Sequence, residues 1–283
     1  MLLQSIKNVN DVTGEYKGVV PYMKQRVITA IIALLILVPI IIYGNWPFII
    51  FAYLLATIGL FEMMRMYNKD KGIIFVIISL PFLWLLLIPY SDLTLGSYTF
   101  NNFSVITLCL LILLTISVFT KNNFTFDQAS FILFVTIYIG TAFYFIIITR
   151  MTGLNYFLFI LFVVWATDSG AYFIGKFFGK RKLWPAISPN KTIGGAVGGL
   201  IIALIVGIVF HLVYAFDFSL SYVIFITIVI SVVGQIGDLV ASAIKRHYDI
   251  KDFGKLFPGH GGVLDRVDSL LFVFIVLHLL QFA

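Results

Sequence analysis

Long apolar runs constrain this chain more than any other feature of its sequence. Hydrophobic residues make up 61% of its 283 positions and charged residues only 11%, which is about half the charged fraction of an ordinary soluble domain. A helix needs about 20 apolar residues to cross the hydrocarbon core of a bilayer, and several runs approach that length. A soluble fold could not bury so much apolar surface. The sequence therefore predicts an all-α, polytopic integral membrane protein.

The boundaries of the apolar runs predict about nine transmembrane helices. We expect these helices at residues 27–43, 47–66, 73–90, 103–120, 129–149, 154–175, 194–214, 219–244 and 266–282. Residues 1–22 are mixed and polar, so we interpret them as a dispensable N-terminal extension. Residues 23–283 are expected to form a single transmembrane domain.

The charges in the loops predict the orientation of these spans. Lys and Arg collect on the cytoplasmic side of membrane proteins. If the N-terminus is cytoplasmic, nearly all of the 19 Lys and Arg lie on that side, and only Arg150 lies on the other. The C-terminus is then outside, because the number of spans is odd. We therefore expect a multi-pass protein of the cell (plasma) membrane, and the net charge does not indicate a nucleic-acid partner.

The end of the eighth expected span carries ionisable residues at helical spacing. Asp238, Ser242 and Lys245 are spaced i, i+4 and i+7, so they share one helix face. An ionisable residue within a span is costly and usually faces the interior of the bundle or a water-filled cavity. Asp238 is thus a candidate for chemistry, and the alternative is a structural ion pair with Lys245 or another basic residue. Glu62, at the end of the second span, is interpreted as a polar anchor at the cytoplasmic side.

A second group of acids begins the last expected span. Asp265 and Asp268 are spaced i and i+3 and can face one point, with Arg266 between them. The helix dipole also favours acids at this position, which is a purely structural explanation. Together with Asp238 they place three carboxylates at one membrane surface beside Lys and Arg. Oxygen ligands of this kind suit Mg²⁺, which takes one or two carboxylates together with substrate phosphates and water.

Glycines precede these acids in the stretch Gly259-His260-Gly261-Gly262. Glycine backbone can approach a phosphate closely and direct N–H groups toward it. We therefore expect this stretch to contact a substrate phosphate.

The sixth expected span and its following loop offer a further cluster. Asp168 and Tyr172 lie on one helical face with Ser169 beside it, and Ser188, Lys191 and Thr192 follow in the loop. Small polar residues and a lysine before a glycine-led helix can bind a phosphate or a nucleotide at the N-terminus of that helix. The alternative is an ordinary basic cytoplasmic loop.

Several common catalytic motifs are absent from the sequence. It contains no G-x-x-x-x-G-K-[ST] phosphate loop, no H-E-x-x-H and no G-x-S-x-G, and its only cysteine is Cys109. These absences argue against P-loop nucleotidases, zinc proteases, serine hydrolases and a disulfide framework.

The polar stretch from Ser242 to Asp268 reads S-x-I-K-R-x-x-x-x-K-D-x-G-x-x-F-P-x-H-G-G-V-x-D-R-V-D. This pattern resembles the signature of the phosphatidate cytidylyltransferase (CDP-diacylglycerol synthase) family of bacterial type at every specified position. The segments Asp168 to Lys176 and Ser188 to Thr192 are also similar to motifs of that family. Gly194 departs from the pattern, because many relatives have an acid there.

The resemblance implies an enzyme that joins CTP to phosphatidate in the bilayer, forming CDP-diacylglycerol and pyrophosphate with Mg²⁺ and leaving room for a second cation. It also implies a homodimer. Two other functions remain open at this point. A CTP-dependent lipid or polyprenol kinase would transfer the γ-phosphate instead, and a transporter would also carry intramembrane acids.

The residues and the resemblance together assign expected roles within an active site formed mainly by residues 165–195 and 234–268. We expect Asp238, Lys245, Asp265 and Asp268 to be catalytic, with the three acids also holding Mg²⁺. The residues expected to bind the substrates are Asp168, Ser169, Tyr172, Ser188, Lys191, Thr192, Ser242, Arg246, His260, Gly261, Gly262 and Arg266.

Overall fold

The computed structural model of the protein describes residues 28, 31–88, 93–95, 98–214, 216, 218–257, 259 and 261–282. The expected extension, residues 1–22, lies outside this part of the chain, and so does His260. An apolar helix spans Ile31–Tyr43. The labelled helices are α2 Asn45–Tyr67, α3 Gly72–Leu86, α4 Asn102–Phe119, α5 Phe126–Thr152, α6 Leu154–Phe178, α7 Ile193–Tyr214, α8 Leu220–His247 and α9 Leu264–Leu279.

The described helices confirm an all-α, multi-pass membrane protein. Six of them, α2 and α4 to α8, are long and apolar enough to cross a bilayer. The other three expected spans coincide with shorter helices, namely Ile31–Tyr43, α3 and α9. The count of nine crossings and the positions of the two termini stay predictions.

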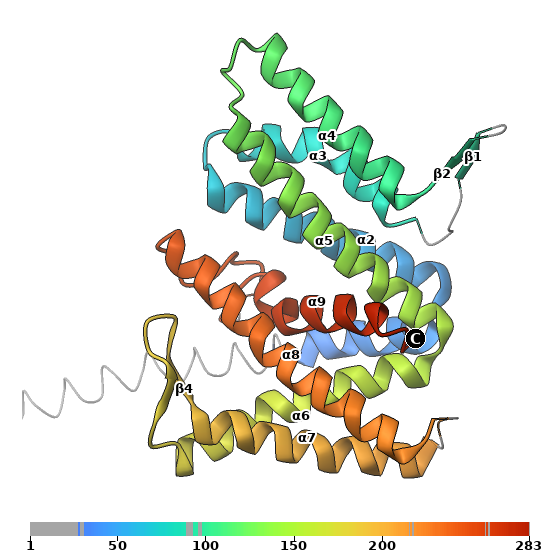
Figure 1. Ribbon diagram of the computed structural model, residues 1–283, viewed down its shortest axis with the longest axis vertical. Helices are drawn as coiled ribbons and strands as arrows, with labels where there is room; N and C mark the ends of the chain where they lie inside the picture. The colour runs from blue at the N-terminus through green and yellow to red at the C-terminus, as the bar shows by residue number, and fades with distance from the viewer. Residues whose placement is uncertain are drawn as a thin grey trace, which may run out of the picture.

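Two short hairpins interrupt the helical pattern. The strands β1 Leu93–Leu95 and β2 Tyr98–Phe100 pair antiparallel, as do β3 Lys182–Trp184 and β4 Ser188–Thr192. The second hairpin occupies the loop that the sequence places next to the active site. It lies on the same side of the molecule as the connection between α8 and α9 (Figure 1).

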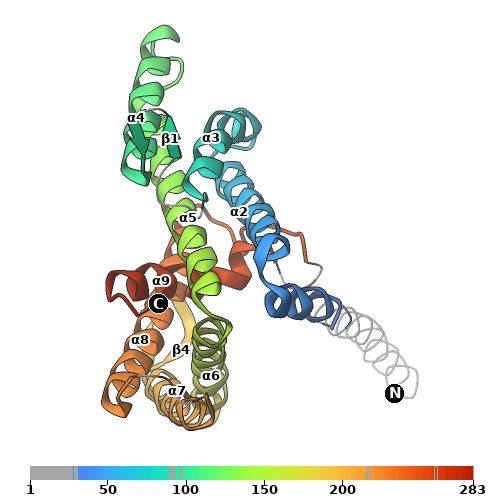
Figure 2. The ribbon, with the colours of Figure 1, turned by 90° about the vertical axis from the view of Figure 1, so that its right-hand side faces the viewer.

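The helices form two groups joined by α5 and α9. In both views α2, α3 and α4 lie in one half of the molecule and α6, α7 and α8 in the other (Figures 1 and 2). α5 contacts α2, α3 and α4 in the first group and also α6 and α9. Buried aliphatic and aromatic side chains fill the spaces between these helices.

Helices α6 and α7 approach each other closely along small residues. A Cβ atom on Gly199 would lie 2.6 Å from the carbonyl oxygen of Thr167, and one on Gly195 would lie 2.7 Å from that of Ala171. Small residues allow backbones to approach in this way within a membrane. The contact fixes β4, which leads directly into α7 and also contacts α6 and α8.

Arg150, the one basic residue expected outside, has a structural partner. Its Nε donates to the carbonyl oxygen of Ile41 at 2.7 Å and its Nη2 to that of Ile42 at 3.0 Å. These carbonyls lie in the last turn of the helix Ile31–Tyr43, where a helix lacks internal donors. The guanidinium also lies against Gly44, whose φ of +69° favours glycine. Arg150 therefore joins the ends of two helices.

Candidate active site

Two ion pairs connect the polar residues of β4, α8 and α9. The Nζ of Lys191, in β4, lies 2.7 Å from Oδ2 of Asp238 in α8. The Nζ of Lys245, near the end of α8, lies 2.8 Å from Oδ1 of Asp265 in α9. The first pair brings together the two ranges, 165–195 and 234–268, that the sequence assigns to one site. The ion pair considered for Asp238 is therefore present, and its partner is Lys191 rather than Lys245.

A cluster of acids surrounds the first ion pair. Asp168 of α6 lies close enough to Asp238 and Lys191 to interact with their charges. Asp268 of α9 interacts in the same way with Asp238, Asp168 and Lys245. Three helices thus direct carboxylates toward one region that also receives two lysines. The acids of this region outnumber the two lysines that pair with them.

Asp265 is bound on both of its oxygens. Besides the contact of Oδ1 with Lys245, its Oδ2 accepts hydrogen bonds from the backbone N–H groups of Phe253 at 2.8 Å and Gly262 at 3.0 Å. Its side chain is only 4% exposed. Asp265 thus holds the lysine of α8 and two points of the loop between the helices at fixed positions.

The glycines before α9 allow the loop to pass close to carboxylates. Gly261 has a φ of +86°, which favours glycine. Its carbonyl oxygen accepts a hydrogen bond from the N–H of Phe257 at 2.9 Å. A Cβ atom on Gly262 would collide with the carboxylate of Glu62. The Gly262 N–H already donates to Asp265 in this structure. The expected contact of this loop with a substrate phosphate stays a prediction.

Glu62 is the residue near the site whose role the sequence did not indicate. It lies in α2 and is 5% exposed. Its Oε1 accepts a hydrogen bond from the N–H of Val263 at 2.9 Å, and its Oε2 accepts one from the N–H of Leu264 at 3.0 Å. It therefore binds the start of α9, and its expected position at the cytoplasmic side stays a prediction. The sequence signal that could have indicated this role is the presence of a single acid in an otherwise apolar span.

The other expected substrate-binding residues occupy different environments. Thr192 is buried, and its Oγ1 accepts a hydrogen bond from the N–H of Gly195 at 3.1 Å, which stabilises the first turn of α7. Tyr172 is 63% exposed, and its ring contacts Phe173. Ser242 lies near Asp238, with 3.5 Å between Oγ and Oδ1.

Ser169, Arg246 and Arg266 are exposed on the helices next to the acid cluster, and Ser188 begins β4. Arg246 donates to the carbonyl oxygen of Ile250 at 3.3 Å. The exposed arginines can therefore be reached by an anion from solvent.

The acids fit Mg²⁺ only with help from the substrates. No group of three or more His, Cys, Asp or Glu side chains lies close enough to hold one ion, as far as the structure describes the chain. Mg²⁺ usually takes one or two protein carboxylates and completes its shell with substrate phosphates and water. Asp238 and Asp268, whose charges interact, are suited to that arrangement.

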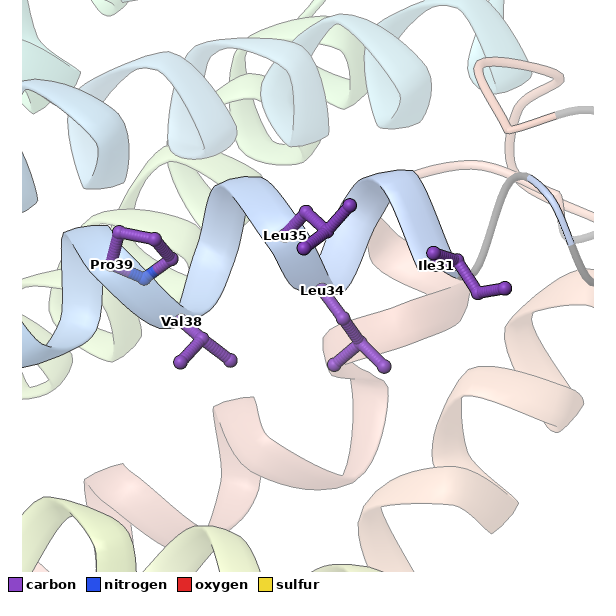
Figure 3. A pocket seen from close by; sticks show the side chains of 5 residues that line it. All are labelled: Ile31, Leu34, Leu35, Val38 and Pro39. Atoms are coloured by element: carbon purple, nitrogen blue, oxygen red, sulfur yellow. The ribbon is translucent and has the colours of Figure 1, made fainter.

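An apolar hollow elsewhere on the surface does not belong to this site. It is lined by Ile31, Leu34, Leu35, Val38 and Pro39, which all come from the first helix (Figure 3). A hollow without polar groups offers nothing to orient a phosphate or a nucleotide.

Comparison with known proteins gives matches over most of the chain. Residues 24–283 match the model of the cytidylyltransferase family. The phosphatidate cytidylyltransferase of Bacillus subtilis (strain 168) is 44% identical over 261 residues, which cover 91% of this chain and 97% of the relative. That of Staphylococcus haemolyticus (strain JCSC1435) is 44% identical over 259 residues, covering 91% and 98%. That of Staphylococcus aureus (strain COL) is 42% identical over 269 residues, again covering 91% and 98%.

These matches extend over nearly the whole transmembrane domain and include the stretch from Ser242 to Asp268 on which the resemblance depended. The resemblance is thereby confirmed, and the chain belongs to the cytidylyltransferase family.

Proposed function

We propose that this membrane protein transfers the cytidylyl group of CTP to phosphatidate, giving CDP-diacylglycerol and pyrophosphate for phospholipid biosynthesis. The observation that carries the proposal is the cluster of paired acids and lysines contributed by β4, α8 and α9 in a chain of this family. One substrate is a lipid whose phosphate stays at the membrane surface, and the other is a soluble polyanion. A charged site at the ends of membrane helices is suited to joining them. Nothing observed favours a kinase or a transporter.

The reaction requires no covalent intermediate with the protein. An ionised phosphate oxygen of phosphatidate attacks the α-phosphorus of CTP, and the bond between that phosphorus and the oxygen bridging to the β-phosphate breaks. Pyrophosphate leaves with that oxygen. Because the attacking oxygen is already ionised near neutral pH, a protein base is not needed. Catalysis then depends on positioning and on neutralising the phosphate charges.

The two ion pairs suggest how the site accepts its substrates. Lys191 and Lys245 each neutralise an aspartate in the structure. Substrate phosphates would attract both lysines, with Arg246 and Arg266 close by. Exchange of the lysines from carboxylate to phosphate would release oxygens of Asp238 and Asp265. Asp265 would keep its backbone hydrogen bonds through Oδ2.

Asp238, Asp265 and Asp268 are the residues proposed to hold Mg²⁺. When bound there, Mg²⁺ neutralises charge on the CTP phosphates and on the leaving pyrophosphate. Asp168 lies next to this set. A homodimer, implied by resemblance, is not needed for these roles.

Product identity tests the proposed reaction. Purified protein is incubated with phosphatidate, Mg²⁺ and CTP labelled on either the α- or the γ-phosphorus. We expect α-label in the lipid product and γ-label in pyrophosphate. Transfer of γ-label to lipid would instead identify a CTP-dependent kinase, and label in neither product would refute both activities.

Asp265→Asn tests the importance of the Lys245 pair. The amide keeps the shape and one accepting oxygen for the loop, but it cannot neutralise Lys245. We expect kcat to fall about 100-fold or more, while the variant still inserts and folds. Asp249→Asn is the matched control, because Asp249 is an exposed acid in the same loop. Near-normal CDP-diacylglycerol formation by Asp265→Asn in detergent would remove Asp265 from the mechanism.

The active site is proposed to face the cytoplasm, because the basic residues of the β3–β4 hairpin and of the α8–α9 loop lie on that side in the orientation favoured by the loop charges. Single cysteines at Lys180 and Thr152, in a Cys109→Ala background, test the orientation. A membrane-impermeant maleimide should label Thr152→Cys in intact cells and Lys180→Cys only after permeabilisation. The reverse pattern would invert the proposed topology.

A further inference from the structure

We propose that Glu62 is a positioning residue for cytidylyl transfer, which holds the first turn of α9 and thereby the acids Asp265 and Asp268 from the distant helix α2. The inference rests on the proposed function, since the positioned acids are those assigned to the reaction. Glu62 itself does not need to touch either substrate.

Glu62 supplies the cap that α9 lacks locally. The first N–H groups of a helix have no partner within it, and a side chain at the N-cap usually accepts from them. The N-cap of α9 is Val263, which cannot do so, and α9 has no side-chain cap of its own. Glu62 instead accepts from Val263 and Leu264 with its two oxygens, at 2.9 and 3.0 Å, across about 200 positions of sequence.

The loop before α9 is shaped to admit this carboxylate. A Cβ atom on either Gly254 or Gly262 would collide with the side chain of Glu62. One turn earlier in α2, a Cβ atom on Gly59 would lie 2.9 Å from the side chain of Leu264. Hydrogen bonds and close packing therefore both fasten the start of α9 to α2.

The chemistry of the contact requires a carboxylate rather than an apolar side chain. Burying a charge is costly unless hydrogen bonds or opposite charges compensate it. No Lys or Arg bonds to Glu62 within the described ranges, so the two N–H groups and the positive end of the α9 dipole provide that compensation. The two oxygens of the carboxylate bind the two adjacent N–H groups separately, one oxygen for each. An apolar residue would leave those groups buried without partners.

The same turn begins the helix that carries Asp265 and Asp268. Gly262, Val263 and Leu264 are consecutive, and their N–H groups bind two carboxylates, Asp265 for the first and Glu62 for the other two. A shift of this turn would move Asp265 relative to Lys245. It would also move Asp268 relative to the acids of α6 and α8. Misplacement of reacting groups by about 1 Å can cost about 100-fold in rate.

Loss of the contact between Glu62 and the first turn of α9 is expected to impair turnover rather than substrate binding. Glu62→Gln keeps one acceptor but places an amide N–H₂ against a backbone N–H, and Glu62→Asp is too short to reach both donors. We expect either variant to lower kcat about 10- to 100-fold. The KM values for CTP and phosphatidate should change by less than about threefold, because Lys191, Lys245 and Arg246 lie on β4 and α8. Arg266 is the one proposed phosphate-binding arginine that moves with α9.

Hydrogen exchange, measured by mass spectrometry on the full chain in detergent, provides a readout independent of activity. In Glu62→Gln we expect faster exchange in peptides covering 253–268 and unchanged exchange in the other helices. Thr57→Val is the matched control, because Thr57 lies on α2 like Glu62. The variant removes the hydrogen bond that Trp84 Nε1 of α3 donates to Thr57 Oγ1, and its kcat should stay at the wild-type value.

Three outcomes would overturn the proposal. These are an unchanged kcat in Glu62→Gln, a general rise in exchange over the whole bundle, or a loss confined to KM. The wild-type protein is assayed first for CDP-diacylglycerol formation. If that reaction fails, the proposed function is refuted, and the exchange data still report whether Glu62 fixes α9.

Discussion

The ion pair between Lys245 and Asp265 is the interaction on which the rest of the site depends. It joins the end of α8 to the beginning of α9 and closes the loop between them. Its side chains are 11% and 4% exposed, respectively. Removing one partner of so buried a pair typically costs about 3–5 kcal/mol, because the other charge is left without compensation. The same aspartate also binds two N–H groups of the closed loop, so the fold of the loop and the position of the lysine depend on one side chain.

The pairing of charges explains how a polar site can exist in so apolar a chain. Each lysine of the site is neutralised by an aspartate before any substrate is present. Asp168 and Asp268 are two further acids that lie near these pairs without a lysine partner of their own among the two ion pairs. Such a site can bind both phosphates and a cation. When a lysine pairs with a substrate phosphate instead of its aspartate, the carboxylate oxygens become free to bind the metal. The neutral pairs thus protect the bundle from isolated buried charges while keeping both kinds of ligand available.

Local patterns in the sequence predict much of the fold, while the roles of the site residues stay predictions. Apolar runs located every described helix, because length and hydropathy are properties of a continuous segment. The spacing of Asp238 and Lys245 correctly placed both on α8 near the loop. Contacts between distant segments were beyond such reasoning. Periodicity shows which face of a helix is polar, but it does not show which helix ends meet.

Two contacts illustrate that limit. The partner of Asp238 is Lys191, which lies in the β3–β4 hairpin. The sequence pattern predicts only a loop in this segment. Glu62 appeared as an isolated acid because its partners are backbone N–H groups of another helix, and backbone groups leave no signature in side-chain patterns. The glycines near α9 were interpreted as phosphate-binding backbone, whereas the structure shows that at least Gly262 makes space for a carboxylate. Both needs favour glycine, so composition alone could not separate them.

A structure determined with a non-reacting CTP analogue and Mg²⁺ bound tests the central claim most directly. We expect nucleotide phosphates in contact with Lys191 and Lys245, both lysines withdrawn from their aspartates, and carboxylate oxygens of Asp238, Asp265 and Asp268 directed at the metal. Nucleotide bound elsewhere, with both ion pairs intact, would contradict it.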